Sequence, residues 1–245
     1  MAKKNKFEQS SDGPSRYKVW AMFDRIAGTY DRINRICSFG QDILWRNKVA
    51  TMVAAGKPEH MVDIATGTAD QMIAQFKAAP SCKEAIGVDY SLGMLQEGQI
   101  KLEKKNLDDR LYMVRGNAMA MPLPDNITDA TTISFGIRNV SDVPLGLKEM
   151  CRVLKPGGKT FILEFGLPSL FFIRWPYLIY FRYILPYIGG IISGDYEAYA
   201  YLNKTVESFP YGKDFVKLMQ DAGFKNVKSH SLTFGVAYIY EGEAP

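Results

Sequence analysis

The chain has 245 residues, of which 47% are hydrophobic and 23% charged, so it is long enough to bury a full core in one large domain. The 30 Lys and Arg residues against 26 Asp and Glu residues give a net charge of +4, and this small excess argues against a nucleic-acid partner. Three scattered cysteines without a CxxC spacing and only two histidines argue against a disulfide framework and a metal centre, so no metal is expected.

The N-terminal stretch MAKKNKFEQSSDGPSRYK is polar and contains five Lys or Arg residues. It has no apolar segment of the kind that a signal peptide requires, so residues 1–17 are predicted to form a flexible tail of a cytoplasmic protein. Residues 18–56 are rich in arginine and aromatic side chains and are predicted to form a helical cap. We expect this cap to belong to a single domain over residues 18–245.

Strand and helix patterns alternate from residue 60 onward. Five apolar runs are predicted to be strands: HMVDIA, EAIGVDY, LYMVRG, DATTISF and KTFILEF. Helical spacing is present between them in ADQMIAQFKA, SLGMLQEGQIKLEKK and VPLGLKEMCRVL, and the last is stopped by the breaker cluster KPGG. Near the C-terminus, the helical YGKDFVKLMQDAG precedes two strands in KNVKSHSLTFGVAYIYEG. This order predicts an α/β fold with a seven-stranded, mostly parallel, Rossmann-like sheet, helices on both faces and a closing antiparallel hairpin.

The segment over residues 167–192, LPSLFFIRWPYLIYFRYILPYIGGII, is dense in aromatic residues. Two arginines interrupt it and its three prolines are expected to break any long helix, so we do not predict a transmembrane span. Residues 167–210 are instead predicted to form a lid inserted after the fifth strand. Contact of residues 167–192 with a membrane surface, a dimer face, and packing of the lid on its own sheet all remain open.

In an open α/β sheet, ligands lie beyond the carboxyl ends of the strands, so residues at these ends are candidate site residues. The first strand reaches Asp63, and Ala65 and Gly67 follow in the tight turn DIATGTAD, where a glycine lets the backbone approach a ligand closely. The turn lacks two glycines of the GxGxxG pattern, which argues against a dinucleotide. Turns of small residues are also common without any ligand, so this stretch alone is weak evidence.

Two further strand ends carry polar residues. Asp89 ends the second strand, where an acid can accept hydrogen bonds from both hydroxyls of a ribose. Its alternative role is to complement the N-terminus of the next helix, but Ser91 is the better cap and leaves Asp89 available for a ligand. Asn117 and Ala118 follow the third strand and suit the edge of an adenine ring, although a plain loop explains them equally well.

The fourth strand opens into SFGIRNVSD, which places Arg138 and Asn139 between apolar neighbours. A guanidinium at the carboxyl end of a strand is a fixed cation with several hydrogen-bond donors. It could stabilise a substrate oxygen, or it could form a salt bridge to Asp142, four residues further on.

Together these strand ends resemble those of the class I S-adenosylmethionine-dependent methyltransferases. Within that superfamily, FDRIAGTYDRIN at residues 23–34 and SFGIRN at residues 134–139 resemble the motifs of ubiquinone/menaquinone-biosynthesis C-methyltransferases. The resemblance extends over about residues 18–241. These two motifs are specific to the family, whereas LKPGG and the turn after the first strand are shared by many methyltransferases.

The resemblance implies cofactor contacts at five positions: Thr68, Asp89, Asn117, Ala118 and Ser134. Asp63, Ala65 and Gly67 line the same turn by the strand-end argument. The family usually has glycines where this chain has Thr66 and Ala69, and a positive φ at either position would require a local adjustment of the turn.

Methylation at an aromatic carbon requires a neighbouring oxygen to be stabilised as it loses its proton. Arg138 is predicted to stabilise this oxyanion and Asn139 to orient a hydroxyl or a water beside it. Glu164 is expected to hold a neighbouring loop rather than to catalyse. Three tyrosines are predicted either to contact the substrate or to pack helices: Tyr30, Tyr199 and Tyr201.

The resemblance therefore implies S-adenosylmethionine-dependent C-methylation of a prenylated quinol, most simply demethylmenaquinol to menaquinol, with a benzoquinol precursor of ubiquinone also open. Two alternatives remain: a methyltransferase of another small apolar molecule, and a catalytically silent cofactor-binding scaffold. We expect a cytoplasmic enzyme, with peripheral contact at the inner face of the membrane and a homodimer as open questions.

Overall fold

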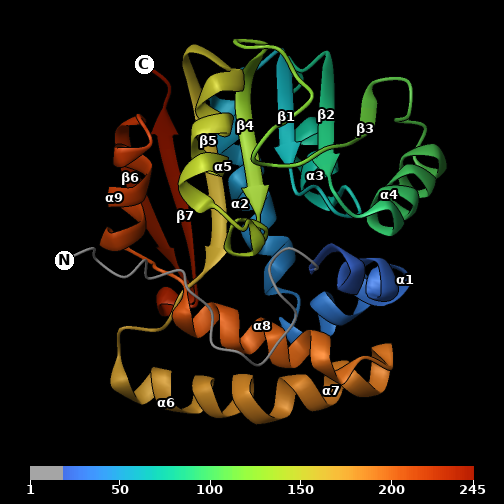
Figure 1. The fold of residues 1–245 in the computed structure, drawn as a ribbon, viewed down its shortest axis with the longest axis vertical. Coiled ribbons are helices and arrows are strands. Elements are labelled where there is room, and N and C mark those ends of the chain that lie inside the picture. The colour runs from blue at the N-terminus through green and yellow to red at the C-terminus, as the bar shows by residue number, and fades with distance from the viewer. Residues whose placement is uncertain (1–18) are drawn as a thin grey trace.

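In the computed structural model, which describes residues 19–245, seven strands form one sheet in the order β3-β2-β1-β4-β5-β7-β6 (Figure 1). The strands are β1 His60–Ile64, β2 Glu84–Asp89, β3 Leu111–Arg115, β4 Thr128–Ser134, β5 Leu154–Phe165, β6 Lys225–Leu232 and β7 Ala237–Glu243. Strands β1 to β5 are parallel, and β7 is antiparallel to both β5 and β6. The predicted fold class and closing hairpin are confirmed, while the tail predicted for residues 1–17 lies outside the described residues.

Helices cover both faces of the sheet. They are α1 Val19–Cys37, α2 Gln41–Ala55, α3 Asp70–Ala78, α4 Leu92–Lys104, α5 Val143–Val153, α6 Phe171–Ile179, α7 Leu185–Ser193, α8 Tyr196–Ser208 and α9 Lys213–Asp221. Adjacent β5 residues point to opposite faces, so Ile162 packs with α5 and α9 while Phe161 packs with α2 and α3. Two separate cores result, one on each side of the sheet.

The order of the strands determines where a ligand can bind. The chain runs outward from β1 to β3 and then returns to place β4 on the other side of β1. This switch leaves a crevice beyond the carboxyl ends of β1 and β4, which is the usual ligand position in open α/β sheets. The candidate residues of the sequence analysis lie around this crevice.

The KPGG cluster does not lie between α5 and the fifth strand as a separate breaker. Helix α5 ends at Val153 and β5 begins at Leu154, so KPGG forms part of β5. Between Leu154 and Lys159, β5 advances five residues while β4 advances only from Thr128 to Ala130. The extra residues bulge out, and Gly157 has a φ of 77° that favours glycine.

The aromatic segment forms a nearly continuous helix, so the predicted break at its prolines is wrong (Figure 1). Helix α6 contains Pro176 and passes into a π-helical stretch, Tyr180–Ile184, from which α7 continues. There the Leu185 N–H bonds to the Tyr180 carbonyl, five residues earlier. This wider spacing accommodates the missing N–H of Pro186 without ending the helix.

Helices α6, α7 and α8 form a layer across the carboxyl ends of the parallel strands, with α1 beside them (Figure 1). A third apolar cluster joins this layer to α1, where Ile26 and Ile33 pack with Phe181 and Leu185. None of the helices within residues 19–245 combines the length and apolarity that crossing a bilayer would require. Because the layer of α6, α7 and α8 lies across the carboxyl ends of the strands and packs on α1, it covers the crevice from outside.

Candidate active site

A buried aspartate holds the turn after β1. Asp63 is 1% exposed, and its two carboxylate oxygens accept hydrogen bonds from Thr132 Oγ1 at 2.5 Å and Thr66 Oγ1 at 2.7 Å. Gly67 follows with a φ of 56°, and a Cβ added there would meet no atom within 4 Å. The space beside this glycine is thus open for a ligand.

The two departures from the family pattern have different consequences. Thr66 does not need a positive φ, and its hydroxyl contributes a bond to Asp63. Ala69 has a φ of 66° at the N-cap of α3, which costs an alanine roughly 1–2 kcal/mol. Ala69 is fully buried, and Ala65 in the same turn also has a positive φ, of 48°, so two alanines of the turn adopt the left-handed region.

Burial raises the pKa of Asp63 from 3.8 to about 6, against the opposing hydrogen bonds from Thr132 and Thr66. Its neutral form therefore stabilises the folded protein below pH 3.8, and this contribution is lost as the pH rises through about 6. The free energy of unfolding of Asp63→Asn, relative to that of the wild type, should therefore increase by about 3 kcal/mol as the pH rises from 4 to 8. Urea unfolding of both proteins at several pH values measures this, and a constant difference would contradict it.

Asp89 holds both the turn and the start of α4. Its Oδ2 accepts from the Gly67 N–H at 2.8 Å and its Oδ1 from the Ser91 N–H at 2.9 Å. Ser91 is the N-cap of α4, as predicted, and accepts from the Met94 N–H. Burial raises the pKa of Asp89, opposed by its backbone hydrogen bonds. The carboxylate is thus fixed in position where β2 meets the crevice.

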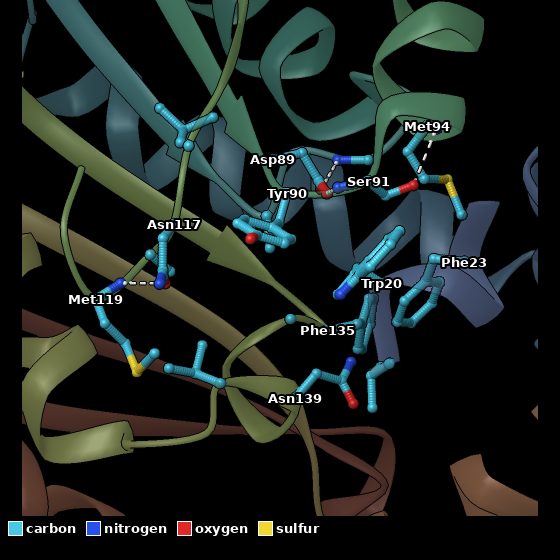
Figure 2. Close-up of a pocket in the computed structure, with 18 of the residues that line it drawn as sticks. Trp20, Phe23, Asp89, Tyr90, Ser91, Met94, Asn117, Met119, Phe135 and Asn139 are labelled. Carbon is cyan, nitrogen blue, oxygen red and sulfur yellow. Dashed lines mark hydrogen bonds between the residues drawn. The ribbon is translucent and has the colours of Figure 1, made fainter. Parts of the chain in front are cut away.

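A cavity of about 240 Å³ opens beside Asp89 at the crevice (Figure 2). Six of the predicted cofactor residues line it: Ala65, Gly67, Asp89, Asn117, Ala118 and Ser134. Trp20 and Phe23 of α1 and Tyr90 after β2 supply aromatic walls (Figure 2). A fixed carboxylate, an amide and flat apolar walls suit a nucleoside with a ribose and an aromatic base.

Asp63 and Thr68 do not line this cavity. They line a smaller polar cavity of about 20 Å³ on the other side of the turn. Thr68 is 3% exposed, and its hydroxyl donates to Asp31 Oδ1 at 2.6 Å. The hydroxyl of Thr68 therefore links the turn to α1.

Lys101 of α4 completes this link, and no motif in the chain points to it. Its ammonium lies 2.6 Å from both Asp31 Oδ2 and Asp70 Oδ1 and 3.1 Å from Thr68 Oγ1. Burial alone would raise the pKa of Asp70, but Lys101, Arg46 and Arg35 together hold it below its ordinary value. A single lysine on an amphipathic helix looks like any solvated residue, so only the fold reveals its role.

Replacing Lys101 with methionine is expected to lower the free energy of unfolding by about 2 kcal/mol, because it leaves two carboxylates without their shared cation. Lys101 is partly exposed, so solvent screening keeps the loss below that of a fully buried pair. Urea unfolding measures it, with the exposed Lys48→Met on α2 as a control that should change little. Equal effects of the two variants would contradict the link.

A second, apolar cavity of about 230 Å³ lies beneath the lid. Its walls come from α1, α2, the lid helices and the β4 and β5 ends, and they include Tyr30, Tyr199 and Tyr201. Four residues line both this cavity and the one beside Asp89: Phe23, Tyr30, Phe135 and Asn139. Tyr30 also lines the small polar cavity, so it lies where all three meet.

Arg138 is in the wall of the apolar cavity, but its ion-pair partner is not Asp142. Its Nη1 lies 2.7 Å from Glu164 Oε1 and also donates to the Phe135 carbonyl. Arg138 is 4% and Glu164 1% exposed. Asp142 is instead the N-cap of α5. The alternative salt bridge is therefore wrong, because β5 lies beside β4 and brings Glu164 to the cation.

The strand order, the cavity at the switch point and the apolar cavity beside it define an S-adenosylmethionine-dependent methyltransferase. The chain belongs to the ubiE/COQ5 methyltransferase family, whose model matches residues 11–243. Among curated relatives, a demethylmenaquinone methyltransferase from Thermus thermophilus is 40% identical over 224 residues, covering 91% of this chain and 100% of that one. Another from Porphyromonas gingivalis is 38% identical over 229 residues, covering 94% of each chain.

Solved structures share the fold at much lower sequence identity. An S-adenosylmethionine-dependent methyltransferase from Thermotoga maritima superposes with a TM-score of 0.61 at 20% identity, covering 92% of this chain and 99% of that one. One from Aquifex aeolicus gives 0.57 at 16% identity, covering 76% and 82%. The cofactor of this enzyme is S-adenosylmethionine, and the residues around the cavity at Asp89 fit its adenosine.

Proposed function

We propose that this enzyme methylates a ring carbon of a prenylated quinol, with demethylmenaquinol as its substrate. The apolar cavity carries the proposal, because it adjoins the cofactor cavity and shares four wall residues with it. Aromatic walls suit a flat quinol ring and the start of an isoprenoid tail. The curated relatives named demethylmenaquinone methyltransferase support the choice of naphthoquinol.

When bound, S-adenosylmethionine supplies an electrophilic methyl group. The residues of the chain must make the ring carbon nucleophilic, which happens when the adjacent hydroxyl of the quinol gives its proton to a water. The hydrogen of the ring carbon leaves as a second proton once the methyl group is attached. The cation of Arg138 in the cavity wall favours the ionised oxygen. Its hydrogen bonds to Glu164 and Phe135 use Nη1, which leaves Nη2 without a partner among the described residues. The oxygen can therefore approach a cation whose orientation is already fixed.

Asn139 lines both the cofactor cavity and the apolar cavity. Its Oδ1 is buried and has no hydrogen-bond partner within residues 19–245. A buried amide oxygen without a partner costs free energy, which a hydroxyl or a water bound there would recover. Asn139 Oδ1 is thus suited to accept a hydrogen bond from a quinol hydroxyl or from a water beside it, and so to orient the ring.

The test is an assay of the purified enzyme with isotope-labelled S-adenosylmethionine and three acceptors: reduced demethylmenaquinone, a prenylated benzoquinol, and a small apolar phenol without a tail. We expect labelled product from the naphthoquinol with the mass of one added methyl group on carbon. Product from the phenol alone would favour a methyltransferase of another small molecule. Cofactor binding without any product would favour the scaffold interpretation.

We also propose that the lid rests on the membrane that holds the substrate. Its outer side exposes large apolar side chains along α6, the π-helical stretch and α7: Phe171, Phe172, Trp175, Tyr183, Tyr187 and Ile191. None of the α6 residues is buried, and Arg174 makes no ion pair with the described residues. Inner lid residues Tyr177 and Tyr180 line the apolar cavity, so the exposed face is continuous with its wall. Aromatic residues with a free arginine suit an anionic lipid interface.

Changing Phe171, Phe172 and Trp175 to serine should reduce binding to vesicles that contain anionic lipid by at least about tenfold, because three exposed aromatic anchors are lost. Deleting residues 170–192 would also remove the cavity wall, so point substitutions are the sharper test. Tyr112→Ser, an exposed aromatic on the edge strand β3, is the control. Unchanged co-sedimentation with loss of a dimer in gel filtration would assign the face to a second copy of the chain.

A further inference from the structure

One buried cation near the cofactor turn has no ion-pair or hydrogen-bond partner among residues 19–245. Arg46 of α2 is 8% exposed, and its Nε is fully buried without a hydrogen bond. No side chain or carbonyl within residues 19–245 forms an ion pair or hydrogen bond with its guanidinium. A ring contact to Phe135, 5.3 Å from Cζ to the ring centroid, is its one specific interaction among these residues. Buried charges are normally paired, so this arrangement requires an explanation.

The nearby acids are already committed to other groups. Asp63 accepts from two threonine hydroxyls, and Asp70 binds Lys101 and Arg35. Arg46 lowers the pKa of both carboxyls, so they partly offset its charge at a distance. Neither forms an ion pair with it. Arg138, the other buried arginine of the site, differs in having Glu164 at 2.7 Å.

The guanidinium borders the small polar cavity beside the turn after β1. Arg46 lines this cavity together with Gly67 and Ser134, which also line the adenosine cavity. It also lines the apolar cavity, as does Tyr30. A group that enters the polar cavity from the adenosine site would therefore meet a cation that lacks a counter-ion.

We propose that Arg46 binds the α-carboxylate of the methionyl group of S-adenosylmethionine. The adenosine end of this cofactor suits the cavity at Asp89, and its other end carries a carboxylate that needs a fixed cation. The planar guanidinium offers paired donors of the geometry that a carboxylate accepts. The cofactor thus supplies the counter-ion that residues 19–245 do not provide. This proposal holds whichever quinol the enzyme methylates.

The test compares three ligands by calorimetry on the full-length enzyme: S-adenosylmethionine, decarboxylated S-adenosylmethionine, and 5′-methylthioadenosine, which lacks the whole amino-acid group. Arg46→Gln should weaken S-adenosylmethionine binding on the order of tenfold to a hundredfold, the range expected for charged hydrogen bonds. Binding of the other two ligands should change less than about threefold. Lys48→Gln removes an exposed charge from the same helix and should change none of the three.

Stability separates this role from a structural one. Removing an unpaired buried charge should not lower the urea midpoint of the free enzyme, whereas loss of a structural cation would lower it. Arg46→Lys keeps the charge without the planar fork and should recover part of the affinity, and it serves as a second variant if the glutamine protein fails to fold. Equal weakening of all three ligands, or of none, would overturn the proposal. Weakened quinol binding alone would assign Arg46 to the apolar cavity instead.

Discussion

Replacing Arg138 with methionine is expected to lower the free energy of unfolding by about 3–5 kcal/mol and to abolish methyl transfer while leaving cofactor binding nearly intact. The stability loss arises because Glu164 is 1% exposed and would lose the guanidinium that offsets the cost of its burial. The catalytic loss arises because the apolar cavity loses the cation in its wall. Urea unfolding, a methyl-transfer assay and calorimetry with S-adenosylhomocysteine measure the three quantities.

A double variant separates the two roles of Arg138. Arg138→Met combined with Glu164→Leu removes both charges and should restore most of the stability, since apolar groups often replace a buried ion pair without loss. Activity should stay absent if the cation stabilises the quinol oxygen. Restored activity would show that Arg138 only neutralises Glu164. Arg182→Met tests a more exposed pair with Glu207 and should lower stability far less than loss of the buried pair.

The position of Arg138 could be predicted from the sequence, but its partner could not. A cation among apolar residues at a strand end is unusual enough to indicate a site, whatever the rest of the fold. Glu164 lies 26 residues further on, at the end of β5, and only the pairing of β4 with β5 brings the two together. Asp142 was the nearest candidate along the chain, yet it caps α5. Contacts across a sheet depend on register, which periodicity does not give.

The central fold could be predicted because apolar residues follow one spacing in strands and another in helices, so the alternation of the two is visible along the chain. The aromatic lid was harder to predict, since its composition is apolar on all sides and its prolines suggested breaks. Pro176 lies inside α6, and none of the α6 residues is buried. Packing against the protein core therefore contributes little to this helix. The cavity residues at strand ends were predictable from topology. Lys101 and Arg46 lie on helices that carry both buried and exposed residues, and nothing in their spacing distinguishes them.

Replacing Asp89 with alanine is expected to weaken binding of S-adenosylhomocysteine at least about a hundredfold. We expect Asp89 to accept hydrogen bonds from both ribose hydroxyls, and two such bonds to a charged acceptor would account for roughly 3–6 kcal/mol. The variant also leaves the Gly67 N–H without its acceptor and loosens the turn. Calorimetry measures the affinity, and urea unfolding shows whether the fold persists.

A neighbouring carboxylate provides the matched control for Asp89. Asp24 also holds the start of α4, since its Oδ1 accepts from Ser91 Oγ at 2.6 Å and from the Gly93 N–H at 2.8 Å. It does not line the cofactor cavity. Asp24→Ala should therefore reduce stability but change affinity little, and equal losses of affinity would mean that Asp89 acts only through α4. Burial raises the pKa of Asp89, so this carboxylate takes up its proton at a higher pH than an exposed aspartate does. As the pH is lowered, cofactor binding should therefore begin to weaken at a higher pH than it would with an exposed aspartate at this position.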